Sequence, residues 1–510
     1  MDHLTFLQEW HQEPGKTILF CFLIIFPFLL LFKNKRSSKL NLPPSPPKLP
    51  IIGNLHQIST LPYRSFRNLS KKYGPLMFLQ LGRVPTVVVS SLEMAQEITK
   101  NHDIIFADRP SLTSVDIVFK ECLDMAFGPY CAYWSGARKL CALHLLSQRR
   151  VQEFHFVREE EVANMVEKIR LLCVNGAAIN ISDLFMILSH NVLAKSAFGC
   201  LYESEDGKYK SFGEMARRAM DLLASFCFSD LFPYLGWIDY LTGLVGNLTE
   251  ISRELNDFFD RVIKERQASM NDDEKSEDKK YLVDILLYLR KEGVELDLSR
   301  NNLKAILMDM FIGGTDTTAA SMDWMMSELM KNPRIMKKAQ EEVRRVVGNK
   351  SNITEDDINQ MEYLKCVMKE TVRFHASAMM PRQTSASVKL QGYDIPKKTR
   401  VFINTWAIQR DPKLWDRPEE FLPERFLNSS KDHNGEHKQL LFSFGTGRRV
   451  CPGMSYAYAE TEYALANLLY WFDWELPDGT REEDLDMSDI YTFVIRRKTP
   501  LWVVAHPHTP

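Results

Sequence analysis

The stretch FGTGRRVCPG, which spans residues 444–453, decides the fold because it presents one cysteine on a glycine-rich loop. Its glycines allow the backbone to approach a large flat ligand closely, and the ring of Phe444 can cover a sulfur atom. The two arginines ahead of Cys451 carry permanent positive charge, which suits carboxylate groups. These parts are what a haem with a thiolate ligand requires. The alternative is a buried structural cysteine on a surface loop.

The same stretch fills the pattern F-x-x-G-x-R-x-C-x-G with Phe444, Gly447, Arg449, Cys451 and Gly453. Here the residues resemble the haem-binding loop of cytochrome P-450 enzymes. The match is specific because five positions coincide at fixed spacing. The resemblance implies that Cys451 is the axial ligand of the iron in haem b, where a thiolate favours cleavage of the O–O bond.

Composition narrows the class of protein. The chain has 510 residues, of which 45% are hydrophobic and 25% charged, and its formal net charge is −2. This balance gives no electrostatic reason to expect a nucleic-acid partner. The nine cysteines are scattered and form no C-x-x-C motif, which indicates reduced thiols in a cytosolic environment.

Residues 17–32, TILFCFLIIFPFLLLF, contain no charge and are followed at once by lysines and an arginine. A full membrane span needs about 20 apolar residues, but the endoplasmic reticulum bilayer is thinner than average. The basic residues place the following chain in the cytosol. A cleaved signal peptide is the alternative, and it would need a basic segment before the apolar run. We therefore expect a short lumenal segment (1–16), a single-pass anchor (17–32) in the endoplasmic reticulum membrane and a catalytic domain facing the cytosol.

The proline-rich stretch LPPSPPKLP, residues 42–50, predicts a stiff extended spacer. Together with the basic residues before it, the stretch forms a stop-transfer segment and hinge over residues 33–50. Beyond it, residues 51–510 show no break that would divide the chain into further domains. Helical spacing dominates 151–265, and strand patterns lie at 76–81, 86–89 and within 388–404. We expect a mainly α fold with small β-sheets (α+β), as the resemblance to cytochrome P-450 also implies.

Residues 301–330 predict one helix about 45 Å long. Its middle, FIGGTDTT at 311–318, holds two glycines, each of which costs a helix roughly 1 kcal/mol relative to alanine. Room for a small ligand beside the helix is one reason for them, and close helix packing is the alternative. Asp316 and Thr317 supply an acid and a hydroxyl, the parts of a proton relay. The stretch resembles the oxygen-activation motif of the same family at every position.

Two further pairs of residues are weak evidence of function by themselves. Trp134 and Arg138 lie one helical turn apart, and so do Glu370 and Arg373. Such pairs are usually ordinary packing or a solvated surface ion pair. In the resembled family, Trp134, Arg138, Arg382 and Arg449 match positions that contact haem propionates. Glu370 and Arg373 match a pair that joins a later arginine, here Arg425, in a buried structural scaffold.

With these motifs, the anchor and the hinge, nearly the whole chain resembles a membrane-bound plant-type cytochrome P-450. The resemblance implies a monooxygenase that inserts one atom of O2 into a hydrophobic small molecule, such as a terpenoid, alkaloid or phenolic. Electrons would come from NADPH through a separate cytochrome P-450 reductase, with cytochrome b5 as a possible second donor and membrane lipid as a further partner. The chain has no convincing flavin or dinucleotide loop of its own.

Substrate contacts are assigned by family position only, and each of them has ordinary core packing as its alternative. They are mostly apolar, which favours a hydrophobic or semi-polar ligand. The candidates are Val115, Phe119, Leu222, Phe226, Met310, Gly313, Ala378, Met379, Met380, Tyr491 and Thr492.

Two other functions stay open at this point. A haem-thiolate isomerase or dehydratase would work without oxygen or reductase and would not need the Asp316–Thr317 pair. A non-catalytic haem protein would sense or carry a ligand. Product formation that depends on NADPH and reductase would separate the monooxygenase from both.

Overall fold

The computed structural model describes residues 40–119, 124–174, 176–201, 212–272, 281–375, 379–427 and 441–509. The predicted anchor at 17–32 and the candidate substrate contact Ala378 lie outside these ranges. Contacts between residues divide the chain into two units, one formed by 43–388 with 396–510 and the other containing 389–395 with the N-terminal residues. The larger unit holds every described candidate residue.

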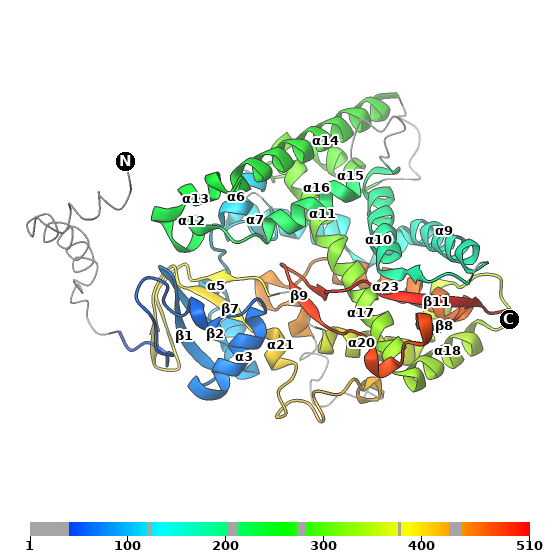
Figure 1. Cartoon of the computed structure of the whole chain (residues 1–510). Coiled ribbons are helices and arrows are strands. Elements are labelled where there is room, and N and C mark those ends of the chain that lie inside the picture. Colours follow the sequence, from blue (N-terminus) through cyan, green and yellow to red (C-terminus); the bar gives the residue numbers. More distant parts are fainter. Residues whose placement is uncertain are drawn as a thin grey trace, which may run out of the picture. The chain divides into compact units, whose positions relative to one another are not determined.

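Helices make up most of the larger unit, as the sequence predicts, and Figure 1 shows them by label. Their bounds are α3 Pro62–Tyr73, α4 Leu92–Gln96, α5 Asp103–Phe106, α6 Thr113–Phe119, α7 Ala132–Leu140, α8 Gln148–Glu153, α9 His155–Cys173, α10 Ile181–Phe198, α11 Phe212–Leu223, α12 Phe228–Leu231, α13 Trp237–Leu241, α14 Leu244–Asp272, α15 Leu282–Lys291, α16 Arg300–Gly314, α17 Asp316–Lys331, α18 Pro333–Val347, α19 Glu355–Asn359, α20 Glu362–Phe374, α21 Thr405–Ile408 and α23 Met454–Trp471.

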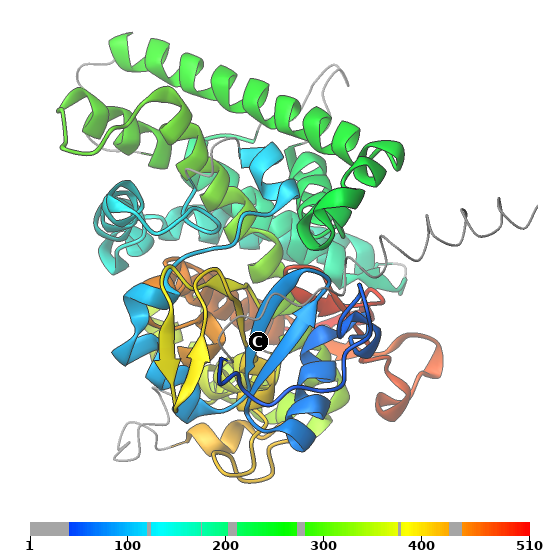
Figure 2. The same ribbon diagram turned by 90° about the vertical axis from the view of Figure 1, so that its left-hand side faces the viewer.

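Small sheets complete the fold. In the largest, the order β1-β2-β7-β4 joins the hairpin of β1 (Leu76–Leu81) and β2 (Val84–Val89) to β7 (Arg400–Ile403) and β4 (Arg382–Gln383). Figure 2 looks towards this hairpin, drawn in blue. A second sheet has the order β3-β11-β8, from Ile179–Asn180, Trp502–Pro507 and Phe472–Glu475. β9 (Asp489–Tyr491) pairs with β10 (Ile495–Arg497), and β5 (Val388–Leu390) with β6 (Tyr393–Ile395).

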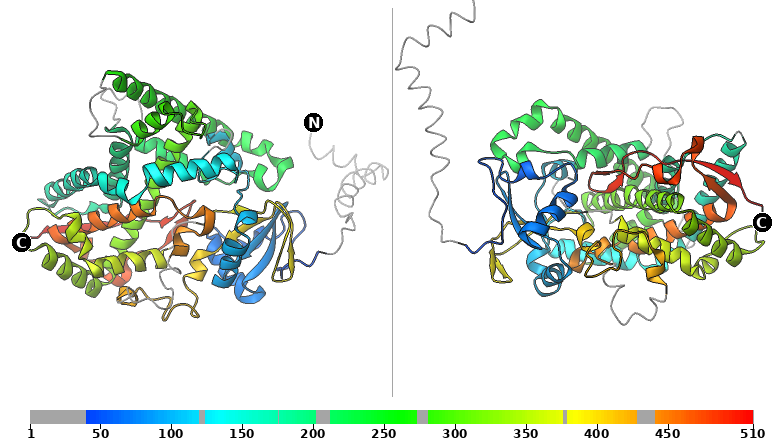
Figure 3. Two further views of the ribbon diagram at one scale, coloured as in Figure 1. Left: turned by 180° about the vertical axis from the view of Figure 1, so that it is seen from behind. Right: turned by 60° about the horizontal axis from the view of Figure 1, so that its bottom comes forward.

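Helix α17 lies in the interior, where it contacts α10, α20 and α23 (Figures 1 and 3). Nearly all of its side chains are buried, including Trp324, whose indole nitrogen donates to the Ile495 carbonyl at 3.0 Å. The preceding helix α16 is anchored by Phe311, whose ring stacks on Phe198 with centroids 5.0 Å apart. These contacts fix α17, which carries the predicted proton relay, and the preceding helix α16.

The prediction of one continuous helix over 301–330 is wrong in one respect. The helix stops at Gly314 and restarts at Asp316, because Thr315 adopts φ −86° and ψ −70° between α16 and α17. The Phe311 carbonyl accepts from the Thr315 backbone amide at 3.2 Å and also from the Thr315 hydroxyl at 2.9 Å. Hydroxyl bonds of this kind bend helices. The break falls within the motif at 311–318.

Candidate functional site

The cysteine loop is held by its own backbone. Gly445 and Gly447 have φ of +79° and +63°, a backbone conformation that residues with a side chain rarely adopt. A Cβ on Gly447 would also lie 2.5 Å from a carboxylate oxygen of Asp103. The loop closes where the Cys451 amide donates to the Phe444 carbonyl at 2.8 Å. The cysteine and the aromatic residue of the motif are thereby brought together.

The environment of Cys451 suits a ligand-binding thiolate. The residue is accessible, yet surrounding protein desolvates the thiol and raises its pKa. An atom that is both accessible and densely surrounded lies on the wall of a hollow. Two features oppose this rise in the pKa, namely a hydrogen bond from the Gly453 backbone and the charge of Arg138. Helix α23 begins directly afterwards, at Met454, and a helix N-terminus also favours a thiolate.

Three buried arginines gather beside the loop. Two of them, Arg382 and Arg449, were predicted, and Arg109 was not. Burial lowers the pKa of all three, and repulsion among them lowers those of Arg109 and Arg449 further, the latter to about 10. Arg449 donates to the carbonyls of Ala107, Met125 and Gly128. Asp103 lies 3.5 Å from Arg382 and partly offsets the positive charge.

Trp134 and Arg138 join this cluster from helix α7. The guanidinium carbon of Arg449 lies 4.0 Å from the ring centroid of Trp134, and that of Arg138 lies 5.6 Å from it. The Trp134 indole donates to the Met125 carbonyl at 3.0 Å, and Arg138 donates to the carbonyl of Val450, next to the cysteine. The structure thus brings together all four residues predicted at the propionates.

The donor set fits haem. Mutually repelling guanidinium groups in a buried site are stabilised by anionic carboxylates, which a haem supplies as its two propionates. Gly453 borders open space, since a Cβ atom added to it would have no other atom within 4 Å. Cys451 offers the iron ligand. We therefore propose that Cys451 and the arginine cluster hold haem in the way the sequence predicts.

The two glycines of the broken helix differ in their surroundings. A Cβ on Gly313 would meet nothing within 4 Å, whereas one on Gly314 would lie 3.0 Å from a methyl group of Leu193. Gly313 therefore borders open space, and Gly314 serves close helix packing. Each of the two explanations considered for the glycine pair applies to one glycine. The Thr317 hydroxyl donates to the Gly313 carbonyl at 2.6 Å, beside that space.

This difference predicts opposite responses to alanine. Gly313→Ala should raise the free energy of unfolding by up to about 1 kcal/mol, because alanine favours the helix and nothing obstructs its methyl group. Gly314→Ala should gain less or lose stability, because Leu193 must move. Thermal unfolding of both variants measures the difference. An equal gain in both would contradict the assignment of open space to Gly313.

Asp316 is buried and ion-paired. Its carboxylate lies 3.9 Å from the guanidinium of Arg496 on β10, which also bonds Asp221 of α11 at 2.8 Å. Burial raises the pKa of Asp316, and the Arg496 charge opposes that rise. The charge of Asp221 raises the same pKa and that of Arg217 lowers it, each by less than the charge of Arg496 does. Sequence reasoning missed Arg496 because only the packing of β10 on α17 brings it to the acid.

Replacing Arg496 by glutamine should raise the pKa of Asp316 further, because the cation that favours the carboxylate is lost. The basic limb of the pH–rate profile, along which a proton donor loses its proton, should then move to higher pH. Arg496→Lys keeps the positive charge and should restore most of the profile. An unchanged basic limb in Arg496→Gln would show that Asp316 does not set it.

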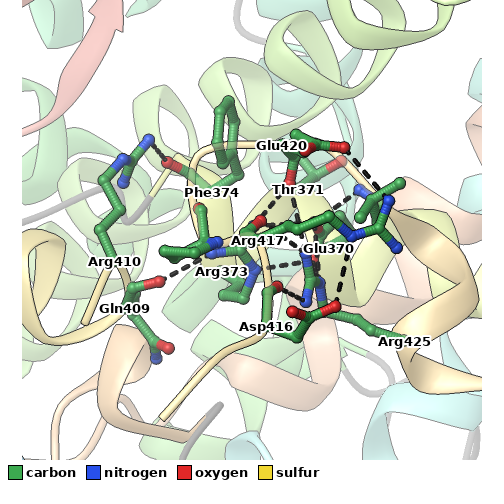
Figure 4. A network of polar contacts seen from close by, with 12 residues as sticks. Glu370, Thr371, Arg373, Phe374, Gln409, Arg410, Asp416, Arg417, Glu420 and Arg425 are labelled. Carbon is green, nitrogen blue, oxygen red and sulfur yellow. Dashed lines mark hydrogen bonds and ion pairs between the residues drawn. The ribbon is translucent and has the colours of Figure 1, made fainter. Parts of the chain in front are cut away.

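Glu370, Arg373 and Arg425 form the network drawn in Figure 4. Glu370 and Arg373 are fully buried and make paired hydrogen bonds of 2.7 and 2.8 Å. The Nε of Arg425 lies 3.1 Å from both carboxylate oxygens of Glu370. Arg373 also donates to the carbonyls of Gln409, Pro418 and Glu420. We refer to Glu370, Arg373 and Arg425 as the Glu370 network, and we propose a structural role for it.

The predicted substrate contacts fall into separate groups. Phe119 of α6 packs on Phe127, which packs on Phe493, so α6 and the segment after β9 are neighbours. The Tyr491 hydroxyl donates to the Met379 carbonyl at 2.9 Å. Four predicted contacts are buried, namely Val115, Phe119, Met310 and Met379, while Leu222 and Met380 are partly buried against the core. Thr492 bonds the Val494 carbonyl.

One predicted substrate contact stands apart from these groups. Phe226 is 55% exposed and packs edge-on against Phe228. Ring packing of this kind, with more than half of the side chain in solvent, is a surface arrangement. Among the described residues, no ring contact joins Phe226 to the other predicted substrate contacts.

Comparisons with known proteins agree with this geometry. The cytochrome P-450 family model matches residues 43–504. A phenylacetaldehyde oxime monooxygenase from Prunus mume is 46% identical over 96% of this chain and 94% of its own length. Cytochrome P-450 71A1 from Persea americana is 48% identical over 96% of this chain and 99% of its own, and desmethylyatein synthase from Sinopodophyllum hexandrum is 45% identical over 94% and 96%. The fold matches a solved zebrafish cytochrome P-450 structure with abiraterone at a TM-score of 0.74, with 24% identity, covering 89% of this chain and 100% of that one.

Proposed function

Since this chain belongs to the cytochrome P-450 family and is a haem-thiolate monooxygenase, we propose that it oxidises a hydrophobic plant specialised metabolite with electrons from NADPH. A separate cytochrome P-450 reductase would deliver these electrons, with cytochrome b5 as an optional second donor. The observation that carries the proposal is Thr317 beside the open space at Gly313, with the buried acid Asp316 next to it.

The chemistry divides between the cofactor and the chain. When bound, haem activates O2 for insertion of one oxygen atom into the substrate. The chain's own residues hold the cofactor through Cys451 and the arginine cluster. Asp316 is the proposed proton donor, because burial raises the pKa of its carboxyl, and the guanidinium of Arg496 lies 3.9 Å from that carboxyl. The Thr317 hydroxyl can pass the proton onward towards the open space.

The substrate is proposed to be hydrophobic, such as a phenolic, alkaloid or terpenoid. Phe119, Phe127 and Phe493 form a chain of ring contacts with centroids 5.8 and 5.2 Å apart. Aromatic walls of this kind favour planar hydrophobic ligands. The relative named for phenylacetaldehyde oxime acts, by its name, on an aromatic compound.

A location at the endoplasmic reticulum membrane is part of the proposal. In the described residues, no helix is long and apolar enough to cross a bilayer. The uncharged stretch at 17–32 and the basic residues after it support a single-pass anchor with the catalytic domain in the cytosol. Tyr234, Trp237, Tyr240 and Leu241 are highly exposed and form an aromatic and apolar surface around α13 that suits contact with lipid.

Reconstitution with reductase tests the proposed function. Microsomes that contain the chain and a plant reductase should convert a phenolic, alkaloid or terpenoid substrate only when NADPH and O2 are both present. Thr317→Ala should lower product formation by about 10²-fold or more while NADPH consumption continues, because the proton donor is lost. Thr317→Ser keeps the hydroxyl and should stay near wild type. Turnover without NADPH would instead favour an isomerase or dehydratase.

A further inference from the structure

A second cleft lies apart from the cysteine loop. Its volume is about 1260 Å³, and its walls come from α3, the end of α17, the start of α18, the end of α20 and the chain around α21. Of the described residues, those that line it include no member of the cysteine loop and none of the predicted substrate contacts. This cleft, which we call the arginine cleft, is therefore distinct from the site above.

Three guanidinium groups surround one indole in the arginine cleft. The guanidinium carbons of Arg64, Arg67 and Arg410 lie 5.6, 5.3 and 4.2 Å from the ring centroid of Trp406. Arg410 also lies 4.4 Å from the ring centroid of Phe374, and Figure 4 shows both residues beside the Glu370 network. Such contacts keep each guanidinium in place while leaving its edge for an anion.

Positive charge exceeds negative charge in this cleft. Seven of the lining side chains are basic and five are acidic. Glu419 pairs with Arg67 at 2.5 Å and with Arg410 at 3.4 Å, which shows that a carboxylate fits between these two arginines. Asp489 pairs with Arg64 at 2.8 Å. These two acids do not satisfy the whole cluster.

Several donors are left over. The Nη1 atom of Arg410 is buried and has no hydrogen-bond partner in the described part of the chain. Burial and the nearby arginines lower the pKa of Arg410 to about 9. Lys331 and Arg334, which also line the cleft, form no ion pair with any described residue. The N-terminus of α18, at Pro333, adds its positive dipole end to the same wall.

We propose that the arginine cleft binds a small organic anion that carries an aromatic ring and a carboxylate or phosphate group. The leftover guanidinium and ammonium groups bind the anionic end, since arginine pairs with carboxylate and phosphate in a bidentate manner. Phe374 and Trp406, which line the cleft, supply apolar walls for the ring. A volume of 1260 Å³ is sufficient for a metabolite-sized ligand.

Binding of phenyl phosphate to the haem-loaded full-length protein in zwitterionic nanodiscs tests this proposal. Isothermal titration should show one site, and binding should persist when an azole occupies the haem iron. In the variant Lys331→Gln/Arg334→Gln, we expect Kd to rise at least about tenfold, because charge-assisted hydrogen bonds to the anion are lost. Inorganic phosphate should compete more weakly than phenyl phosphate, and neutral phenol should not compete.

A matched control removes the same charge elsewhere. Arg149 and Arg481 are 90% and 67% exposed and lie outside the cleft, so Arg149→Gln/Arg481→Gln should leave Kd within about twofold. Unfolding temperatures of both double variants check that each is folded. An equal loss of affinity in both, displacement by the azole, or no binding at millimolar concentration would each overturn the proposal. Equal affinity for inorganic phosphate would overturn the part that requires an aromatic ring.

Discussion

Replacing Glu370 by alanine is expected to prevent accumulation of folded, haem-loaded protein. The substitution removes the carboxylate that pairs with Arg373 and Arg425, whose side chains are 0% and 10% exposed. Two buried guanidinium groups then lose their counter-ion. Breaking a buried pair in this way costs about 3–5 kcal/mol, a large part of the roughly 5–15 kcal/mol that stabilises a typical domain. The Leu422 amide, which donates to Glu370 at 2.7 Å, loses its acceptor as well.

The yield of soluble protein after detergent extraction and its unfolding temperature measure this effect. Glu362→Ala is the matched control, because Glu362 lies on the same helix α20 with its side chain exposed. It should behave like wild type, within about 2 °C. If Glu370→Ala reached wild-type yield and unfolded within that same margin, the buried network could not be a structural requirement.

Cys451→Ala is expected to abolish monooxygenase activity. No other residue of the loop offers a soft ligand for iron, and the loop's glycines, its Phe444–Cys451 hydrogen bond and the start of α23 all serve to position this one sulfur. Product formation with NADPH and reductase should fall to background. The protein itself should remain folded, because the loop is closed by the backbone hydrogen bond from Cys451 to Phe444, which alanine keeps.

Cys366→Ala provides the control for this substitution. Cys366 is buried in α20, and burial raises the pKa of its thiol to about 11, so it stays protonated and is suited only to packing. Its removal should cost some stability and leave activity per haem unchanged. Residual NADPH-dependent turnover in Cys451→Ala at more than a few per cent of wild type would show that another group holds the cofactor.

Much of the architecture follows from local patterns in the sequence. The strand patterns at 76–81 and 86–89 are confirmed, since these residues lie in the paired strands β1 and β2. Spacing alone places Glu370 and Arg373 on one helix face. The partnership with Arg425 spans 55 residues, and so it followed only from the family resemblance.

Residues that depend on long-range packing could not be predicted. Arg109 joins Arg382 and Arg449 because the chain before α6 folds over β4, and its sequence context carries no distinctive signal. Arg496 meets Asp316 only through the contact of β10 with α17. The break at Thr315 was also missed, because helix propensity measures the cost of two glycines but not where the backbone will bend.

The reduced carbon-monoxide difference spectrum tests thiolate ligation most directly. It should be recorded on the membrane-expressed protein at full haem loading, beside Cys451→Ala. Wild type should give the red-shifted Soret band of a thiolate-bound iron, and the variant should lack it. A wild-type band typical of histidine-ligated haem, in folded and fully loaded protein, would contradict the assignment of Cys451 as the iron ligand.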